Sequence, residues 1–507
     1  MTHLPLRNRP FHGRARMLTG CGSAALALAL AAGSGEAAAQ GIQAEHNVVF
    51  GDASVFNLAS PTGGTTLVEA NTPTVVIDWT PFEDAQGNAL DFLPEGNEAI
   101  FQNGPNVLDF AVLNRILPST NGSVVVINGT VIGRIQQSTA RGTPLSPFVA
   151  FYSPTGFLIG STAVFDVGQL MLTTLDTTPE NFDSFVQGGT LNLAAQAGST
   201  ALINIAPGAQ VTSLAENGFF AVVGAQVQMS GTALVNGSQA YVAGEVVNLR
   251  LSNGLFDIEV PVGTAAGGNV LQLDGTIGGP ASTGASTDNH VIYGVAAAQN
   301  DPIAVLLGGN IGFAPAQQAG IVNGEIILSA NFDVFGRTVD GGSSDQGIDA
   351  KFGSGGANGR PFGAVFIDNV TASSRLMAVS SDLTRLSAVG GNVTVGGNVL
   401  LASRGAAEIR VGVGDAFSST GDILVAADAF GGSGGTPRGG IADAFAGDAL
   451  IEVLSGGLFD TDGSVRISAD AFAGADSLTN TLGSAEGGNA SFIASGAQVG
   501  IDGSTTI

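Results

Sequence analysis

Aspartates in the C-terminal third are the residues whose types and spacing come closest to a chemical site. Asp460-Thr461-Asp462-Gly463 opens like a calcium-binding loop, but the glutamate that would complete such a loop is missing downstream. Two carboxylates could also hydrolyse a polysaccharide, although no pair is singled out by its spacing. Because aspartate commonly caps turns, we expect that role for the whole group. Its members are Asp415, Asp422, Asp428, Asp443, Asp448, Asp460, Asp462 and Asp470.

Histidine and glycine patterns give no support for a metal, cofactor or nucleophile site. His46 and His290 are the only histidines after residue 39, and neither has a cysteine, an acidic pair or a second histidine at ligand spacing. We expect both to be surface histidines. No G-x-S-x-G motif occurs, and the glycine-rich runs are not followed by Lys-Ser/Thr, so they indicate turns and not phosphate loops. We therefore expect no enzyme, no cofactor and no metal.

Short apolar runs separated by Gly, Asn, Asp and Ser must position these residues. Of the 507 residues, 76 are glycine, 44% are hydrophobic and 12% are charged, a composition too apolar for a disordered chain. Residues 190–193 and 201–205 alternate with period two, which predicts strands. Residues 75–79 predict another strand, in which Trp79 is expected to anchor the core or a cap. The pattern indicates an all-β protein rich in turns.

The chain is strongly acidic, with a formal net charge of −25. Such a surface would repel a nucleic acid backbone, so we expect no nucleic acid partner. The charge favours solubility and could attract divalent cations, but it locates no site.

Residues 1–39 have the pattern of a secretory signal peptide. Arginines between residues 7 and 16 form a basic region, residues 18–32 are apolar, and Ala37-Ala38-Ala39 offers a cleavage site before Gln40. Cys21, the only cysteine, follows Leu18-Thr19-Gly20 as in a lipoprotein box, but the apolar run comes after the box and not before it. Cleavage after Ala39 would leave a chain without cysteine. We expect no membrane span, because the apolar run is short and later runs are interrupted by polar residues.

A repeat of 42 residues marks the C-terminal third. Ala427-Asp428-Ala429-Phe430 recurs as Ala469-Asp470-Ala471-Phe472, and Gly414 and Phe417 recur as Gly456 and Phe459. We interpret each unit as two coils of about 21 residues, because one coil cannot bury its apolar face whereas stacked coils share a core. About 15 coils would then follow residue 185, with parallel strands about 4.8 Å apart. Residues 263–288, 341–363 and 431–440 are expected to be projecting loops.

Residues 112–176 carry a second kind of pattern. Leu113-Asn114-Arg115 precedes a run of β character, and Ser153-Pro154-Thr155-Gly156 forms a tight turn that starts one short apolar strand after another. This arrangement resembles the N-terminal secretion domain of the filamentous haemagglutinin family, the exoproteins of bacterial two-partner secretion (TPS). The family pattern has Leu-Asn-Arg ahead of an Asn-Pro-Asn-Gly-Ile turn. Ser153 and Thr155 replace its two asparagines, while Pro154 and Gly156 match.

The resemblance covers roughly residues 48–262 and implies a fold and a partner. It favours a right-handed parallel β-helix with a less regular N-terminal cap. The expected organisation is a signal peptide at 1–39, a TPS-like secretion domain at 40–262, a β-helix with loop insertions at 263–345 and a repeat β-helix at 346–507. It also implies recognition by an outer-membrane transporter barrel through Leu113, Asn114, Arg115, Ser153, Pro154, Thr155 and Gly156.

The resulting hypothesis is a secreted or cell-surface exoprotein of adhesin or haemagglutinin type. Its target would be a host or abiotic surface, with carbohydrate as one candidate ligand. A secreted polysaccharide-processing enzyme on a similar β-helix is the alternative. A toxin-bearing relative is a third reading, in which the effector would lie beyond residue 507.

Overall fold

The computed structural model describes residues 40–60, 63–135, 147–283, 288–314, 324–340, 360–430, 444–472, 475–476, 481–482 and 485–507. All of them belong to one unit, Ala38–Ile507. The predicted signal peptide, Cys21, Asp443, the predicted loop at 431–440 and most of the predicted loop at 341–363 lie outside the described residues.

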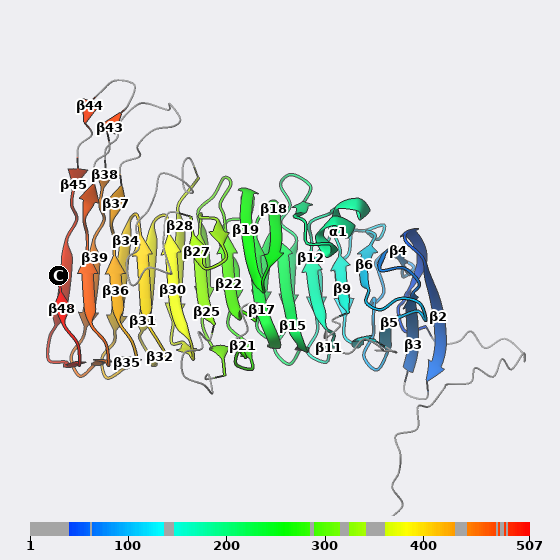
Figure 1. Ribbon diagram of the computed structural model, residues 1–507, viewed down its shortest axis with the longest axis horizontal. Helices are drawn as coiled ribbons and strands as arrows, with labels where there is room; N and C mark the ends of the chain where they lie inside the picture. Colours follow the sequence, from blue (N-terminus) through cyan, green and yellow to red (C-terminus); the bar gives the residue numbers. More distant parts are fainter. Residues whose placement is uncertain are drawn as a thin grey trace, which may run out of the picture. The chain divides into compact units, whose positions relative to one another are not determined.

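Three strands make up each coil of a parallel β-helix, and each strand pairs with its equivalents in the coils before and after (Figure 1). The strands therefore form three faces, which the chain visits in the same order in every coil. This arrangement confirms the predicted all-β, parallel β-helix fold.

The first face is an 11-stranded sheet. Its strands are β7 (Val125–Ile127), β10 (Phe157–Ile159), β14 (Leu202–Ile205), β16 (Gln226–Met229), β20 (Gly268–Leu273), β23 (Ile303–Leu307), β28 (Gly363–Asp368), β31 (Leu383–Ala388), β34 (Ala406–Val411), β39 (Ala449–Val453) and β46 (Ala490–Ala494).

The second and third faces are joined by two long strands, β15 (Gln210–Gly224) and β17 (Thr232–Ala243), which contribute to both. The other strands of the second face are β8 (Thr130–Arg134), β11 (Val164–Asp166), β21 (Thr276–Gly279), β24 (Asn310–Phe313), β29 (Thr371–Ala372), β32 (Val393–Val395), β35 (Ala416–Ser419), β40 (Leu458–Thr461) and β47 (Gln498–Ile501). Those of the third face are β9 (Phe148–Tyr152), β12 (Gln169–Thr173), β22 (Val291–Ala296), β25 (Glu325–Ala330), β30 (Arg375–Ser380), β33 (Val399–Ser403), β36 (Ile423–Ala426), β41 (Val465–Ser468) and β48 (Thr505–Thr506).

The N-terminal end departs from this regular pattern, as the sequence predicts. Strands β3 (Gly63–Ala70) and β5 (Glu98–Asn103) lead into the second face, and β4 (Thr74–Pro81) and β6 (Ala111–Ile116) lead into the third. Two further strands, β1 (Ala44–Phe50) and β2 (Ala53–Ser60), pair antiparallel with β4 and β3. Antiparallel strands thus cover the first parallel coils and form the cap.

Five described insertions leave the helix at one corner, after a third-face strand and before the next first-face strand. The first holds α1 (Pro179–Val186) and β13 (Leu191–Ala194). The second is the hairpin of β18 (Val246–Ser252) and β19 (Leu255–Val262), and the third is β26 (Val334–Phe335) with β27 (Thr338–Val339). Strands β13, β18, β19, β26 and β27 join in one antiparallel sheet, here called the outer sheet.

The last two insertions extend away from the coils in Figure 1. They contain β37 (Ala429–Phe430) and β38 (Ala444–Phe445), followed one coil later by β42 (Ala471–Phe472), β43 (Ala475–Asp476), β44 (Thr481–Leu482) and β45 (Ala485–Glu486). β37 pairs in parallel with β42, and β38 with β45, so the stacking of the coils continues into these insertions.

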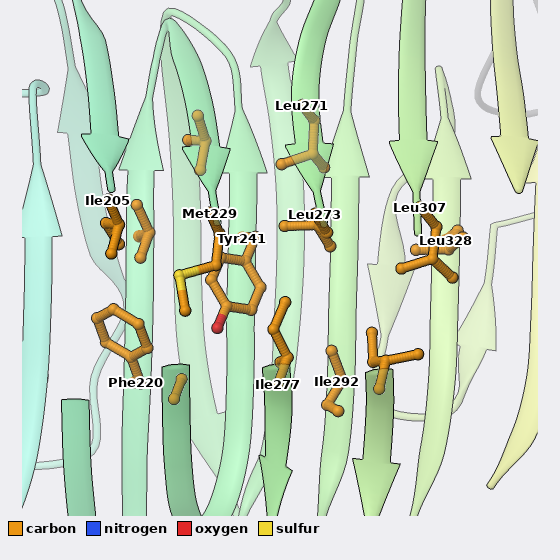
Figure 2. Close-up of a cluster of buried hydrophobic side chains, with 14 of the residues drawn as sticks. Ile205, Phe220, Met229, Tyr241, Leu271, Leu273, Ile277, Ile292, Leu307 and Leu328 are labelled. Atoms are coloured by element: carbon orange, nitrogen blue, oxygen red, sulfur yellow. The ribbon is translucent and has the colours of Figure 1, made fainter. Parts of the chain in front are cut away.

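Apolar side chains in columns fill the interior of the helix. On the first face Ile205, Met229, Leu273 and Leu307 lie in register in four successive coils (Figure 2). Phe220, Tyr241 and Ile292 of the third face point into the same core (Figure 2). Each of these residues is almost completely buried, so every coil depends on its neighbours for its core.

A second apolar core lies on the outer side of the third face. Leu113, Ala150, Met171, Ala221 and Ala240 lie in register there, and Tyr293, Ile327, Met377, Leu400 and Leu424 continue the row. α1 and the outer sheet contribute to this core. Since both sides of these strands are buried, they read as continuous apolar runs and not as alternating patterns.

The repeat found in the C-terminal third is one coil and not two, so our two-coil interpretation is wrong. Phe417 pairs directly with Phe459 and Ile423 with Val465, so each residue of the repeat meets its own equivalent in the next coil. Coils without an insertion are little more than half as long, as the pairs Leu386–Ile409 and Val393–Phe417 show. The insertion that contains β37 and β38 accounts for the remaining length.

Two other expectations are also wrong, each for its own reason. From β14 onward the described part of the first face has nine strands, hence nine coils, where the sequence predicts about 15. The segment 263–288, predicted to be a projecting loop, contains β20 and β21 of the coils. The coil count is too high because insertions make some coils longer than about 21 residues. The segment 263–288 is predicted to be a loop because small residues in its short strands hide the strand pattern in the sequence.

Candidate functional site

The segment Leu113-Asn114-Arg115 lies on β6, where successive side chains point to opposite sides. Leu113 points into the outer core and is 1% exposed. Asn114 points into the helix, between Ile77 and Phe151 of the neighbouring coils, and is fully buried. Only Arg115 keeps access to solvent, with 22% of its side chain exposed.

Asn114 joins the cap to the first complete coil. Its side-chain oxygen accepts a hydrogen bond from Trp79 Nε1 at 3.0 Å, and its amide nitrogen donates to the Ala150 carbonyl at 3.1 Å. Trp79 is 1% exposed and packs edge-on against Phe92, which confirms the expected anchor role. A buried amide with both ends bonded specifies how these coils stack, because any shift would leave buried polar atoms unpaired.

Arg115 is the centre of a polar group at the N-terminal end of the outer core. Its Nε lies 3.6 Å from Asp78 Oδ1, and a terminal nitrogen lies 3.7 Å from Asp176 Oδ2. Tyr152 is in register with Arg115 on the next coil. Burial, reinforced by the charge of Asp176 and opposed by that of Arg115, raises the pKa of Tyr152 to about 12.

The turn Ser153–Gly156 follows β9 immediately, so it begins beside this polar group. Ser153 is fully buried, its Oγ lies 3.0 Å from Thr155 Oγ1, and Thr155 Oγ1 also donates to the Ser123 carbonyl at 2.8 Å. Gly156 has a φ of 97°, and a Cβ there would come within 2.6 Å of the Leu202 carbonyl oxygen. The serine and threonine hydroxyls thus provide polar groups at the positions where the family pattern has asparagine.

The structure brings all seven predicted residues onto two adjacent coils. Leu113, Asn114, Ser153 and Gly156 are buried, whereas Arg115, Pro154 and Thr155 retain partly exposed side chains. The first four therefore shape the coil, and the last three are the ones that a partner could touch once the coil has folded.

The aspartates of the C-terminal third confirm the turn-capping prediction where their bonds are described. Asp422 Oδ1 accepts from Ser464 N at 2.8 Å, and Asp448 Oδ1 accepts from Asn489 N at 2.9 Å. Asp428 Oδ1 accepts from Asp470 N at 2.8 Å. Each carboxylate caps the backbone of the following coil. Among the described residues, no group of three or more His, Cys, Asp or Glu side chains could hold a metal ion.

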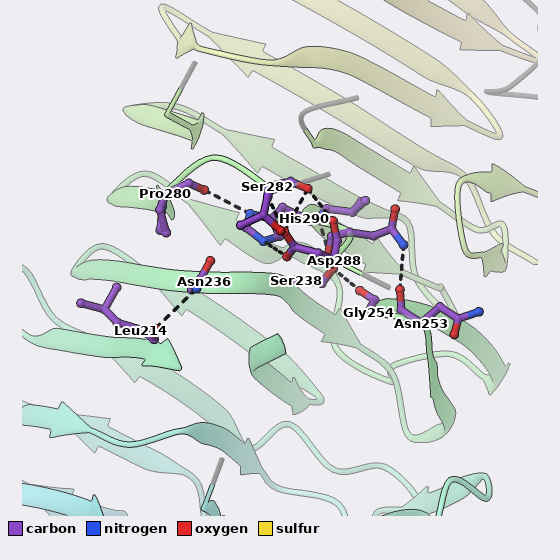
Figure 3. Close-up of polar contacts among 12 residues, drawn as sticks. Leu214, Asn236, Ser238, Asn253, Gly254, Pro280, Ser282, Asp288 and His290 are labelled. Atoms are coloured by element: carbon purple, nitrogen blue, oxygen red, sulfur yellow. Dashed lines mark hydrogen bonds and ion pairs between the residues drawn. The ribbon is translucent and has the colours of Figure 1, made fainter. Parts of the chain in front are cut away.

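His290 is buried, not at the surface as predicted, whereas His46 is exposed. Nε2 of His290 lies 2.7 Å from Asp288 Oδ1, and Nδ1 lies 3.1 Å from the Pro280 carbonyl (Figure 3). The ring packs against Phe313. Burial disfavours the ionised form of Asp288, but hydrogen bonds from Thr283 and the neighbouring His290 outweigh it and lower the pKa of Asp288. The two-residue spacing Asp288-x-His290 is the signal that could have revealed this pair.

A second feature that the sequence analysis missed is α1, whose two buried phenylalanines pack against Phe148 in the outer core. Thr178 caps its first turn, Pro179 follows, and Phe182 and Phe185 are its buried residues. Thr-Pro-Glu followed by two phenylalanines three residues apart is a recognisable helix start. No helix in the described part of the chain reaches the length and apolar character that a membrane crossing requires.

No protein-family model matches the chain, and no curated protein matches it. Among solved structures, the chain is similar to the HMW1 secretion domain from Haemophilus influenzae. The identity is 16% and the TM-score 0.33, with 92% of this chain and 100% of that one covered. It is also similar to a filamentous hemagglutinin secretion domain, at 14% identity and a TM-score of 0.31, with 91% of this chain and 99% of that one covered.

Proposed function

We propose that this chain is an exoprotein exported by two-partner secretion. In this proposal residues 40–262 form the secretion domain, which an outer-membrane transporter barrel recognises. The exported chain then acts at the cell surface or in the medium as an adhesin of haemagglutinin type. Its target is a host or abiotic surface, with carbohydrate as one candidate ligand.

The observation that carries the proposal is the placement of the two sequence segments that resemble the family. Leu113-Asn114-Arg115 lies on β6, and Ser153-Pro154-Thr155-Gly156 is the turn that follows the neighbouring strand β9, in which Tyr152 is in register with Arg115. β6 also pairs with β4, the strand on which the cap strand β1 packs, and Trp79 of β4 donates a hydrogen bond to Asn114. Segments that are well separated in sequence thus form one feature at the N-terminal end of the helix, where a chain exported N-terminus first would begin to fold.

The construction of the coils agrees with export as an unfolded chain. Each coil pairs in parallel with the one before it, so a folded coil offers a template for the next. Cys21 is the only cysteine, and a chain cleaved after Ala39 could not be locked by a disulfide before export. The acidic, solenoid surface would then be available for binding outside the cell.

The test is secretion of the full chain by bacteria with and without a co-expressed outer-membrane transporter of the two-partner type. We expect export only with the transporter, and deletion of residues 112–176 should abolish it. Excision of residues 407–448 is the matched control, because it removes one coil and joins Ala406 to Ala449 in register. That control should be exported normally. Normal export of the 112–176 deletant, or export without any transporter, would refute the proposal.

A further inference from the structure

A row of small polar side chains crosses the outward side of the second face. Its six members lie in register on successive coils, on strands β17, β21, β24, β29, β32 and β35. They are Thr232, Thr276, Asn310, Thr371, Thr394 and Ser418, here called the polar row. The four middle members are exposed, and the first and last are partly exposed. Five steps between coils give the row a length of about 24 Å.

The polar row is uniform, whereas another face of the same coils is not. The equivalent outward row of the first face runs in register through the same six coils. Its members are Gln228, Gln272, Leu306, Phe366, Arg385 and Glu408. That row mixes amide, apolar and charged side chains, as the alternation of a strand allows for outward positions. A row that keeps one size and one chemistry over six coils indicates a ligand that repeats along the helix axis.

The hydrogen-bonding groups of the polar row are available to such a ligand. A threonine or serine hydroxyl both donates and accepts, and so does an asparagine amide. Within the described part of the chain the first four side chains of the row make no hydrogen bond, and the hydroxyls of Thr394 and Ser418 lie 3.4 Å apart. Two residues beyond the second and third members lie Gly278 and Gly312, so no side chain stands beside the row there. A Cβ at Gly278 would come within 1.9 Å of the Gly312 carbonyl oxygen.

Charge narrows the class of ligand. The polar row carries no charge, and Asp274 is the only charged residue within two positions of any member. Its carboxylate already accepts hydrogen bonds from Ser230 and Gln272. An anionic ligand would be repelled by a chain of net charge −25, and a cationic ligand would find no carboxylate in the row. The chemistry that the row matches is therefore a neutral ligand rich in hydroxyl groups.

We propose that the polar row binds a neutral, extended β-1,4-linked polysaccharide that lies along the helix axis. In such a glycan each sugar unit advances about as far as one coil, so every member of the row meets a ring at an equivalent place. Each contact is weak alone, but several on one rigid surface act together. The row exists only after the coils have folded, so the glycan is met outside the cell. That location rests on the proposed function, whereas the chemistry of the ligand rests on the row.

The direct test uses the purified full chain and three labelled oligosaccharides, cellohexaose, maltohexaose and cellobiose. Fluorescence polarisation should show saturable one-to-one binding of cellohexaose. Maltohexaose has the same sugars in α-1,4 linkage, which curls the chain, and cellobiose spans only about two coils. Each should therefore bind at least about tenfold more weakly than cellohexaose. Equal affinities for cellohexaose and maltohexaose would overturn the inference, as would self-association of the chain in place of glycan binding.

Matched double variants locate the binding. Thr276→Val with Thr371→Val removes two hydroxyls but keeps side-chain size and strand propensity, and should weaken cellohexaose binding about tenfold. Thr80→Val with Thr505→Val, at two exposed strand positions outside the row, should leave the binding unchanged. Unchanged binding in the first double variant would show that the glycan binds elsewhere and would refute the inference. Equal weakening in the two double variants would likewise count against it.

Failure of the proposed function would look different. If cellohexaose binding depends on the polar row but secretion does not need a transporter, the row stands and the export proposal fails. If secretion needs the transporter but cellohexaose does not bind, only the inference about the row fails.

Discussion

The coils near the N-terminus and those near the C-terminus share one backbone geometry but differ in how the third face is covered. In the first group an aromatic series crosses the outer core, with ring centroids 5.1 Å apart for Phe148 and Phe219 and 5.7 Å apart for Phe219 and Phe256. In the last coils the outer row ends at Arg466, which is in register with Leu424. The N-terminal coils therefore have two cores, whereas the last coils rely on one.

The C-terminal coils are stabilised in a different way, by side-chain contacts that recur between each coil and the next. Asn398, Asp422 and Ser464 each accept a hydrogen bond from a backbone N–H of the next coil. Phe417 and Phe459 stack in the interior at 5.0 Å with an interplanar angle of 15°. The comparison teaches that a β-helix can be stabilised either by a layer shared among many coils or by contacts repeated from one coil to the next.

The largest expected effect is on the shared layer. Phe219→Ala should reduce the stability of the N-terminal coils by about 3–5 kcal/mol, because Phe219 is 2% exposed and contacts phenylalanines from the coils, α1 and the outer sheet. Hydrogen exchange should show faster exchange throughout α1 and the outer sheet. Phe362→Ala, at a position 66% exposed, should stay within about 0.5 kcal/mol of the parent. Equal losses in the two variants would contradict the comparison.

The second largest loss of stability is expected when the buried amide of Asn114 in the candidate site is removed. Asn114→Leu leaves Trp79 Nε1–H and the Ala150 carbonyl without a partner, at a cost of about 1–3 kcal/mol. Urea denaturation followed by Trp79 fluorescence reports on this region, since Trp79 is the only tryptophan. Asn47→Leu, at an exposed position of β1, is the control. An unchanged denaturation midpoint for Asn114→Leu would show that the amide does not hold the cap to the first coil.

A single cap in the C-terminal coils should matter less. Asp422→Ala removes the acceptor of the Ser464 N–H and should cost about 1 kcal/mol, whereas Asp422→Asn keeps an acceptor and should cost less. Hydrogen exchange of the Ser464 amide gives the most local measurement. Faster exchange restricted to the coils on either side is expected. A loss that extends to α1 would mean that the two regions are coupled.

The smallest expected effect concerns the ionisation of Tyr152, which can be followed by absorbance. The pKa of Tyr152 is raised to about 12, and burial raises those of Tyr241 and Tyr293 as well. Since the folded state holds the phenolic proton more tightly than the unfolded state, the stability from Tyr152 is full below pH 10 and declines as the pH rises toward 12. Absorbance at about 295 nm should show no tyrosinate in the folded protein at pH 10. Asp176→Asn should lower the pKa of Tyr152, and ionisation of Tyr152 near pH 10 in the parent would contradict its burial.

Strand periodicity and turn residues sufficed to predict the fold class, the anchor role of Trp79 and the capping aspartates, because these depend on local pattern. The position of the candidate residues on strand and turn was also readable, since Pro154 and Gly156 specify a turn. What local pattern could not give was the pairing of distant strands. It takes the register of Phe417 with Phe459 to show that one whole repeat makes one coil.

Burial by distant segments was equally hidden from the sequence. His290 has polar neighbours in sequence, which suggest exposure. In the folded chain it is buried because its ring packs against Phe313 and its Nδ1 lies next to the Pro280 carbonyl. The outer core likewise needs α1 and the outer sheet to lie over strands that are distant in the chain. The apolar runs at 218–224 and 240–243 were its only local sign, because a strand buried on both sides loses its alternation.

The outer sheet also has a mechanical consequence. Its five antiparallel strands pack across several coils. Tension along the helix axis would therefore have to break the hydrogen bonds and apolar contacts of this sheet before any coil beneath it could separate. Among the described residues no such sheet covers the last coils, so under the same load they should separate one at a time from the C-terminal end. A pulled molecule would then show a series of small extensions, longer for the coils that carry an insertion, followed by one larger rupture.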